Sequence, residues 1–184
     1  MKRICIFAGS RPGNHPSYER KAAELGRLIA EQGLEIVYGG SRLGLMGAAA
    51  DAALSHGGKV IGVMPGGLFR KEIAHEGLTE FIEVDSMHER KALMSKLADA
   101  YIALPGGFGT FEELFEVLCW AQIGLHQKPI GVLNIEGYYN PVLELILHTA
   151  EAEFMPMSQT KLLVSDHEAA GLLEKLISYQ FPLS

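Results

Sequence analysis

The chain has 184 residues and a formal net charge of −6, and 48% of its residues are hydrophobic. This length and composition predict a single globular domain over residues 1–184 and exclude disordered, collagen-like and coiled-coil proteins. The balance of 16 Lys and Arg against 22 Asp and Glu argues against a broad nucleic-acid surface. A small phosphorylated ligand needs only a local site, so it remains compatible with this charge.

The short apolar runs predict strands, which in chain order are Ile4–Ala8, Glu35–Tyr38, Lys59–Met64, Phe81–Val84, Ala100–Leu104, Ile130–Asn134 and Leu162–Val164. Helical spacing predicts helices at Tyr18–Gln32, Leu45–His56, Met87–Ala98 and Thr110–Ile123, one opened by Asn140-Pro141, and a last one capped by Ser165 with Glu168. Ser86 with Glu89 forms a capping box for the third helix. The alternation predicts an α/β fold, a Rossmann-like, doubly wound, mostly parallel sheet with helices on both faces.

The two cysteines, Cys5 and Cys119, predict neither a disulfide framework nor a zinc quartet. The seven histidines show no metal-ligand spacing, so we expect no metal. The apolar run from Ile4 to Ala8 is too short for a signal-peptide core, and no stretch approaches the roughly 18 apolar residues of a membrane span. We therefore expect a cytoplasmic protein without a membrane partner.

Glycines gather at the carboxyl ends of the predicted strands. The clusters are Gly9-Ser10-Arg11, Gly39-Gly40-Ser41-Arg42, Pro65-Gly66-Gly67 and Pro105-Gly106-Gly107-Phe108-Gly109-Thr110. Ligands bind at that edge of open α/β sheets, and glycine lets backbone N–H groups approach a ligand closely. Two of these loops run directly into helices, whose N-termini favour phosphate. Each cluster alone could be a tight turn, but four at one edge favour a phosphate site.

The standard nucleotide motifs are absent. Gly107-x-Gly109 is followed by Glu112 where the dinucleotide fingerprint needs a third glycine. Gly58-Lys59 is followed by Val60, so there is no ATP-hydrolysing P-loop. We therefore predict neither of these nucleotide sites and expect no cofactor.

The segment from Pro105 to Glu113 resembles the P-G-G-x-G-T-x-x-E signature of the LONELY GUY family, the cytokinin riboside 5′-monophosphate phosphoribohydrolases. Met87-His88-Glu89-Arg90-Lys91 resembles the family's M-x-x-R-K segment, and Gly39 to Gly47 resembles its first phosphate-side loop. Trp120-Ala121-Gln122 and Gly137-Tyr138-Tyr139-Asn140 also sit where the family has them. The likeness covers roughly residues 2–153 and departs at Cys119, where several plant members have threonine.

This resemblance implies a hydrolase that cleaves the N-glycosidic bond of AMP or of N6-substituted (cytokinin) adenosine 5′-monophosphates. The products would be the free base and ribose 5-phosphate. It implies Arg90 and Glu113 as catalytic residues and a homodimer or larger homo-oligomer. By position, the implied substrate contacts are Glu72, Arg90, Lys91, Gly106, Gly107, Phe108, Gly109, Thr110, Glu113, Ser10, Gly40, Ser41, Gly44, Met46 and Gly47.

Members of this family were long labelled lysine decarboxylases. The Ser-x-His-Lys segment typical of pyridoxal-phosphate decarboxylases is absent from this chain, which is also far shorter than such enzymes. We therefore do not predict decarboxylation.

The residue types suit glycosidic cleavage. The reaction builds positive charge on the ribose, which the carboxylate of Glu113 would stabilise. Arg90 stays charged, so it would hold the substrate and neutralise charge rather than donate a proton. Plainer interpretations remain open, because Thr110 with Glu113 could be a capping box and Arg90-Lys91 a solvated helix face.

Two other functions also remain open. A non-catalytic carrier of a nucleotide or phosphorylated cofactor would use the same loops, and release of base from AMP separates it from an enzyme. A DNA-processing Rossmann protein conflicts with the net charge of −6.

Apolar residues extend beyond one face of two predicted helices. They are Leu93, Met94 and Leu97 on the first, and Phe111, Phe115, Leu118 and Trp120 on the second. Because such helices are buried in the domain or against a partner, we expect a homodimer built partly on them.

Overall fold

The computed structural model describes residues 1–66 and 74–182 of the chain. Within that part, seven strands form one sheet in the order β4-β3-β2-β1-β5-β6-β7, and every pair of neighbours is parallel. The strands are β1 (Arg3–Phe7), β2 (Glu35–Tyr38), β3 (Lys59–Pro65), β4 (Glu80–Val84), β5 (Ala100–Ala103), β6 (Ile130–Leu133) and β7 (Leu163–Asp166). The predicted α/β class and parallel sheet are confirmed.

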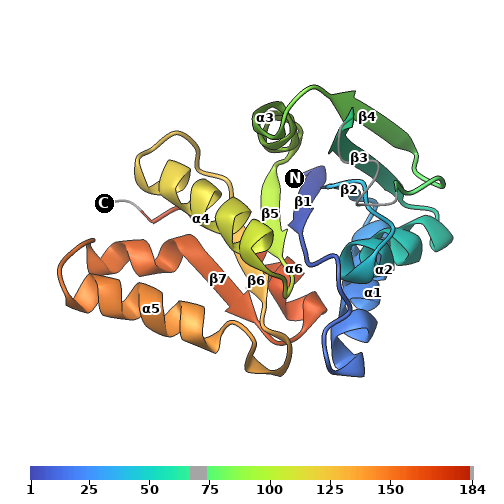
Figure 1. Cartoon of the computed structure of the whole chain (residues 1–184). Coiled ribbons are helices and arrows are strands. Elements are labelled where there is room, and N and C mark those ends of the chain that lie inside the picture. The colour runs from blue at the N-terminus through green and yellow to red at the C-terminus, as the bar shows by residue number, and fades with distance from the viewer. Residues whose placement is uncertain (67–73, 183–184) are drawn as a thin grey trace.

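Helices cover both faces of the sheet (Figure 1). They are α1 (Pro16–Glu31), α2 (Gly44–Ser55), α3 (Met87–Leu97), α4 (Phe108–Gln122), α5 (Asn140–Glu151) and α6 (Ala169–Ile177), with short 3₁₀ turns η2 (Ile135–Gly137) and η3 (Met157–Leu162). Ile4 and Ile6 of β1 pack in one core with α1, α2 and α6. Cys5 and Phe7 pack in the other core with α3, α4 and the start of α5. The alternation along β1 therefore divides the interior into two layers.

The strand order reverses between β1 and β5 (Figure 1). The chain moves outward from β1 to β4 on one side, then returns to β5 and moves outward to β7 on the other. Loops that leave neighbouring strands in opposite directions open a crevice between them, the usual ligand site of such sheets. The glycine clusters after β1 and β5 border this crevice.

The capping box predicted for α3 is confirmed. The Oγ of Ser86 accepts a hydrogen bond from the backbone N–H of Glu89 at 3.2 Å. The carboxylate of Glu89 reaches back and accepts from the N–H of Asp85 at 2.9 Å. These bonds satisfy donors at the helix start and fix the direction of the first turn, which carries Arg90.

Other predicted helix starts are wrong by a few residues. Ser165 lies in β7, and α6 follows a turn in which Asp166 accepts from the N–H of Glu168 at 2.8 Å. Asn140 is the first residue of α5 rather than its cap, because its side chain accepts instead from Asn134 at 2.7 Å. In the described residues no helix is long and apolar enough to cross a membrane.

Candidate functional site

A cavity of about 220 Å³ opens at the reversal point of the sheet. Its lining comes from β1, the loops after β1, β2 and β5, and helices α2, α3 and α4. The lining residues are Ile6, Ala8, Gly9, Ser10, Gly39, Met46, Arg90, Gly107, Gly109, Thr110 and Glu113. We call it the Arg90 cavity.

A second cavity of about 550 Å³ shares Gly9, Ser10 and Gly107 with the first. We call it the Tyr138 cavity. Its other lining residues are Arg11, Pro12, Gly13, Asn14, Tyr18, Leu45, Pro105, Gly106 and Tyr138. The loops after β1 and β5 therefore have open space on two sides.

Arg90 and Glu113 meet in the Arg90 cavity. The Nε of Arg90 donates to the carbonyl oxygen of Val63 at 3.0 Å, and Nη1 donates to Oε1 of Glu113 at 3.4 Å. The side chains are only 10% and 11% exposed. A solvated helix face is therefore wrong for Arg90, whose charge sits in a cavity wall where electrostatic effects are stronger than in water.

Lys91, the next residue, has a different environment. Its Nζ contacts the carboxylates of Glu112 and Glu116 on α4, the latter at 2.9 Å. The hydrogen bond that Nζ donates to Glu112 is the main reason that the pKa of Lys91 lies above its ordinary value. Lys91 thus ties α3 to α4, and it does not line either cavity.

Gly39 makes room for the guanidinium of Arg90. A Cβ atom at this position would lie 2.0 Å from Nη2 of Arg90 and 3.3 Å from Sδ of Met46. The backbone of Gly39 is not left-handed, so close approach rather than φ explains the glycine. Sequence reasoning assigned the neighbouring Gly40 to the substrate and missed Gly39, although the glycine pair after β2 was a signal.

The loop after β5 leads into α4 at Phe108, with Gly107 as the N-cap residue and no side-chain capping bond. The alternative interpretation of Thr110 and Glu113 as a capping box is therefore wrong, because these are the third and sixth residues of the helix. The N–H groups of the first turn have no intrahelical acceptor. Thr110 is buried, and both it and Glu113 line the Arg90 cavity.

Gly107 and Gly109 face open space. Beyond its chain neighbours and the backbone of α4, a Cβ atom at either position would meet no atom of the described residues within 4 Å, and neither residue has a positive φ. Packing and backbone conformation therefore do not require glycine here. What the two glycines leave is free access to the N–H groups at the start of α4, which is the arrangement that binds an anion.

Several predicted contacts lie outside both cavities. Gly40 has a φ of +80° beside Phe81, and the Oγ of Ser41 accepts from the N–H of Leu43 at 3.2 Å. Cβ atoms at Gly44 and Gly47 would lie 2.4 Å and 2.0 Å from the backbones of Arg11 and Arg42. These four residues shape the loops, and their substrate contacts stay predictions.

The side chain of Phe108 is 95% exposed. Glu72 lies outside the described residues. The predicted residues that the structure brings together at the two cavities are Ser10, Met46, Arg90, Gly106, Gly107, Gly109, Thr110 and Glu113.

Among the described residues, no group of three or more His, Cys, Asp or Glu side chains could hold a metal ion. Cys5 lies behind the site, and its burial is the main reason that the pKa of its thiol is well above the ordinary value. The thiol is therefore a neutral core group.

The model of the family described as "Possible lysine decarboxylase" matches residues 46–176. A probable cytokinin riboside 5′-monophosphate phosphoribohydrolase of Oryza sativa subsp. japonica is 47% identical over 97% of this chain and 79% of its own length. A cytokinin riboside 5′-monophosphate phosphoribohydrolase of Arabidopsis thaliana is also 47% identical, over 97% of this chain and 84% of its own length. The chain belongs to the LONELY GUY family.

The fold of this LONELY GUY protein is shared more widely. The solved structure of the molybdenum cofactor carrier protein from Chlamydomonas reinhardtii has a TM-score of 0.74 and 21% identity, covering 97% of this chain and 99% of that one. At that identity the likeness extends to the fold alone.

Lysine decarboxylation would need pyridoxal phosphate on a Schiff-base lysine. None of the described residues that line the two cavities is a lysine. Lys91, one residue from Arg90, is held by Glu112 and Glu116 instead. The described residues of the site do not fit that cofactor.

We predict that Gly39→Ala displaces the guanidinium of Arg90, because the added methyl group would lie 2.0 Å from Nη2. Misplacement of a group in the site should lower kcat/KM for the nucleotide hydrolysis named for the relatives by about tenfold or more. Since the backbone conformation suits alanine, the thermal midpoint should change by only about a few degrees.

A double-mutant cycle with Arg90→Lys provides the control. Lysine has no Nη2 atom, so adding Gly39→Ala to the Arg90→Lys variant should lower kcat/KM by less than about twofold. If Gly39→Ala lowers kcat/KM by the same factor in the wild type and in Arg90→Lys, then Gly39 does not act by making room for Arg90.

Proposed function

We propose that this protein hydrolyses the N-glycosidic bond of adenosine 5′-monophosphates and releases free base and ribose 5-phosphate. The observation that carries the proposal is one cavity that combines the buried Arg90–Glu113 pair with the open N-terminus of α4. The names of its relatives support cytokinin nucleotides as substrates, and AMP shares their phosphate and ribose.

The 5′-phosphate would bind at the start of α4. Backbone N–H groups at Gly109 and Thr110 and the hydroxyl of Thr110 are available donors at this end of the helix. The positive end of the helix dipole adds to their attraction for the phosphate. Ser10 lines the same cavity from the loop after β1 and would complete this part of the site.

Glu113 would act on the ribose. The glycosidic bond breaks with positive charge developing on the sugar ring, and a fixed carboxylate stabilises that charge. The same carboxylate can orient the water whose oxygen bonds to the anomeric carbon. Since Glu113 lies one helical turn beyond Thr110, a bound phosphate would place the ribose beside it.

Arg90 would act on the departing base. The base leaves with the bonding electron pair and later receives a proton, so a permanent positive charge nearby lowers the cost of departure. The hydrogen bond of Nε to Val63 and the contact of Nη1 with Glu113 fix the guanidinium plane. Nη2, beside Gly39, is the nitrogen closest to the loop after β2.

The alternative is a non-catalytic carrier of a nucleotide or phosphorylated cofactor. It would use the same N–H groups but would not require Glu113 beside the ribose. We also propose a cytoplasmic location, which the free thiols of Cys5 and Cys119 support.

Incubation with AMP, N6-isopentenyl AMP and adenosine, followed by chromatography of the free base, tests the proposal. Both nucleotides should release base. The kcat/KM for AMP should exceed that for adenosine about a hundredfold, since loss of the phosphate hydrogen bonds costs on the order of 3 kcal/mol. Binding of AMP without release of base would favour the carrier, and equal rates on AMP and adenosine would refute the phosphate assignment.

Glu113→Gln tests the carboxylate. Glutamine can still accept the hydrogen bond from Arg90 but lacks the negative charge that the cationic ribose needs. We expect kcat to fall by about 10²–10⁴-fold, the usual scale for a lost acid–base or electrostatic group, while the protein remains folded. Melting temperature and kcat are both measured.

The matched control is Glu89→Gln, at the start of α3, where the glutamine oxygen can still accept from the N–H of Asp85. Its rate should stay within a few-fold of wild type. If Glu113 serves only to balance the charge of Arg90, Glu113→Gln will also keep near wild-type turnover, and the catalytic assignment falls.

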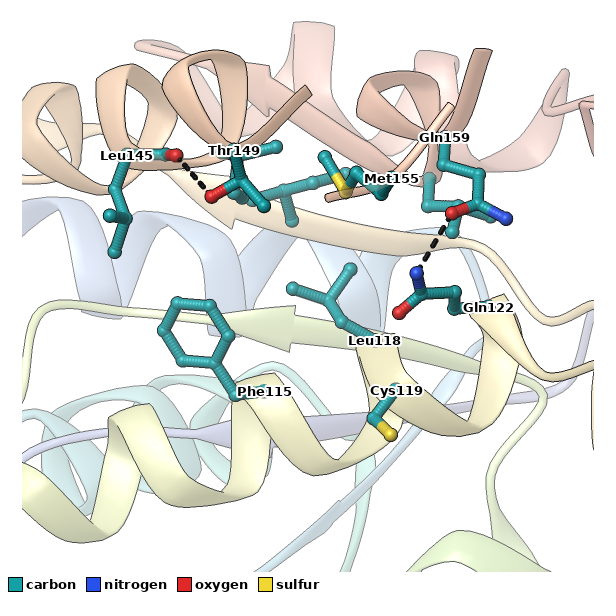
Figure 2. Close-up of a pocket in the computed structure, with 11 residues that line it drawn as sticks. Phe115, Leu118, Cys119, Gln122, Leu145, Thr149, Met155 and Gln159 are labelled. Carbon is teal, nitrogen blue, oxygen red and sulfur yellow. Dashed lines mark hydrogen bonds between the residues drawn. The ribbon is translucent and has the colours of Figure 1, made fainter. Parts of the chain in front are cut away.

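We further propose that the protein is a homodimer. A groove of about 260 Å³ runs between α4 and α5, and its lining is mainly apolar. Figure 2 shows Phe115 and Leu118 of α4 facing Leu145 and Met155 across it. Leu145 is about half exposed, and exposed apolar surface of this kind favours a partner.

The exposed apolar surface that supports a dimer lies on α4 and α5 rather than on α3. On α3, Leu93, Met94 and Leu97 pack into the core of this chain. We therefore assign the interface to the groove between α4 and α5, with a second copy of the chain as its occupant.

Light scattering at micromolar concentration should give twice the mass of the 184-residue chain. Leu145→Glu should give a monomer, because a charge in an apolar interface loses its hydration. Leu147→Glu is the matched control, since Leu147 is similarly exposed on α5 but does not line the groove. A monomeric wild-type protein would contradict the proposal.

A further inference from the structure

Four consecutive carbonyl groups lead into α4, and each has a hydrogen-bond donor. Leu104 O accepts from the hydroxyl of Tyr139 at 2.6 Å, and Pro105 O accepts from the N–H of Gly9 at 3.0 Å. Gly106 O accepts from the hydroxyl of Tyr138, and Gly107 O accepts from the N–H of Phe111 at 3.1 Å. Two of the four donors are neighbouring tyrosines from outside the loop.

The direction of these carbonyls matters for an anion. In a trans peptide the C=O and N–H groups point in opposite directions, so the carbonyl of Gly106 and the N–H of Gly107 turn together. A carbonyl that turned toward the cavity would bring a partial negative charge against a phosphate. Glycine pairs have wide backbone freedom, so the Gly106–Gly107 peptide needs bonds from outside to hold one orientation.

The connection from β6 to α5 brings the two tyrosines to the loop. Buried Asn134 accepts from the N–H of Tyr139 at 2.7 Å and donates to the side chain of Asn140 at 2.7 Å. Glu136 and Gly137 have φ values of 52° and 70°, which bend the chain tightly before Tyr138. This turn is therefore fixed by its own hydrogen bonds.

The ring of Tyr138 also contacts α4. It stacks on Phe111 with the ring centres 6.3 Å apart and an angle of 4° between the planes. It meets the edges of Tyr18 and Tyr139 at 6.2 Å and 5.2 Å. These contacts fix the ring, so its hydroxyl is aimed at Gly106 O with little freedom left to lose.

We infer that Tyr138 and Tyr139 are positioning residues. They hold the carbonyls of Gly106 and Leu104, respectively, away from the 5′-phosphate, and in this way they keep the N–H donors of the loop directed toward the phosphate. This inference rests on the proposed function for the identity of the anion. Neither tyrosine lines the Arg90 cavity, and although the ring of Tyr138 lines the Tyr138 cavity, both hydroxyls are bonded to carbonyls of the loop, so both act through the loop. Tyr138 controls the Gly106–Gly107 peptide, and Tyr139 anchors the loop two peptides further back, at Leu104–Pro105.

The variants Tyr138→Phe and Tyr139→Phe test this inference, because each removes one hydroxyl and keeps the ring. We expect kcat/KM for AMP to fall about tenfold in each, the scale of one lost hydrogen bond to the loop, and the low rate on adenosine to stay unchanged. The affinity for ribose 5-phosphate, measured by calorimetry, should fall by a similar factor. A merely structural role would lower the rates on AMP and adenosine together.

Tyr101→Phe is the matched control. It removes the hydroxyl of another buried tyrosine, which pairs with Ser95 Oγ at 2.7 Å, away from the loop. The ratio of AMP to adenosine rates should stay at the wild-type value in this variant.

The inference is overturned if Tyr138→Phe keeps the wild-type ratio of AMP to adenosine rates and the wild-type affinity for ribose 5-phosphate. If Tyr139→Phe does not fold, Tyr138→Phe decides, because its half-buried ring keeps every ring contact. A wild-type protein that binds AMP but releases no base would overturn the proposed function alone. The affinities of the variants for AMP would then still decide the positioning role.

Discussion

The close approach of two backbones at the reversal point of the sheet is the contact on which the site depends. The N–H of Gly9 donates to Pro105 O at 3.0 Å, and a Cβ atom at Gly9 would lie 3.1 Å from the Cα of Gly106. The carbonyl of Gly9 accepts from the N–H of Leu45 at 3.1 Å, which connects the start of α2 to the same point. Both cavities open around this contact, so even a methyl group at Gly9 would require the loop after β5 to shift by a few tenths of an ångström.

A buried charge is the second constraint. Arg90 occupies the space that Gly39 leaves, and its guanidinium has one carbonyl and one carboxylate as described partners. Burial of a guanidinium is costly unless its charge is balanced, so the nearby carboxylate of Glu113 contributes to the stability of the fold as well as to the proposed reaction. This double demand explains why two groups of opposite charge can persist in a cavity wall.

The sequence was sufficient for the features that are local along the chain. The strands and the capping box of Ser86 follow from patterns of a few residues, and the parallel arrangement follows from the alternation of strands and helices. The start of α4 did not follow, because Thr110 and Glu113 fit a capping box by spacing while the helix begins two residues earlier behind Gly107. The roles of Gly39 and Tyr138 depend on contacts with Arg90 and Gly106, which are remote in sequence, and only the structure brings those pairs together.

The first two turns of α4 carry two parts of the proposed site at a fixed spacing. Thr110 and Glu113 lie on one rigid helix, so their separation along its axis, about 4.5 Å for three residues, is fixed by helix geometry. Helix α4 therefore fixes the distance between a phosphate bound at its start and the carboxylate that faces the attached ribose. Arg90 comes from α3, and its distance to Glu113 depends on the packing of two helices, which Lys91 reinforces through Glu112 and Glu116. The spacing within α4 is thus readable from the sequence, whereas the placement of the opposing charge is a property of the folded chain.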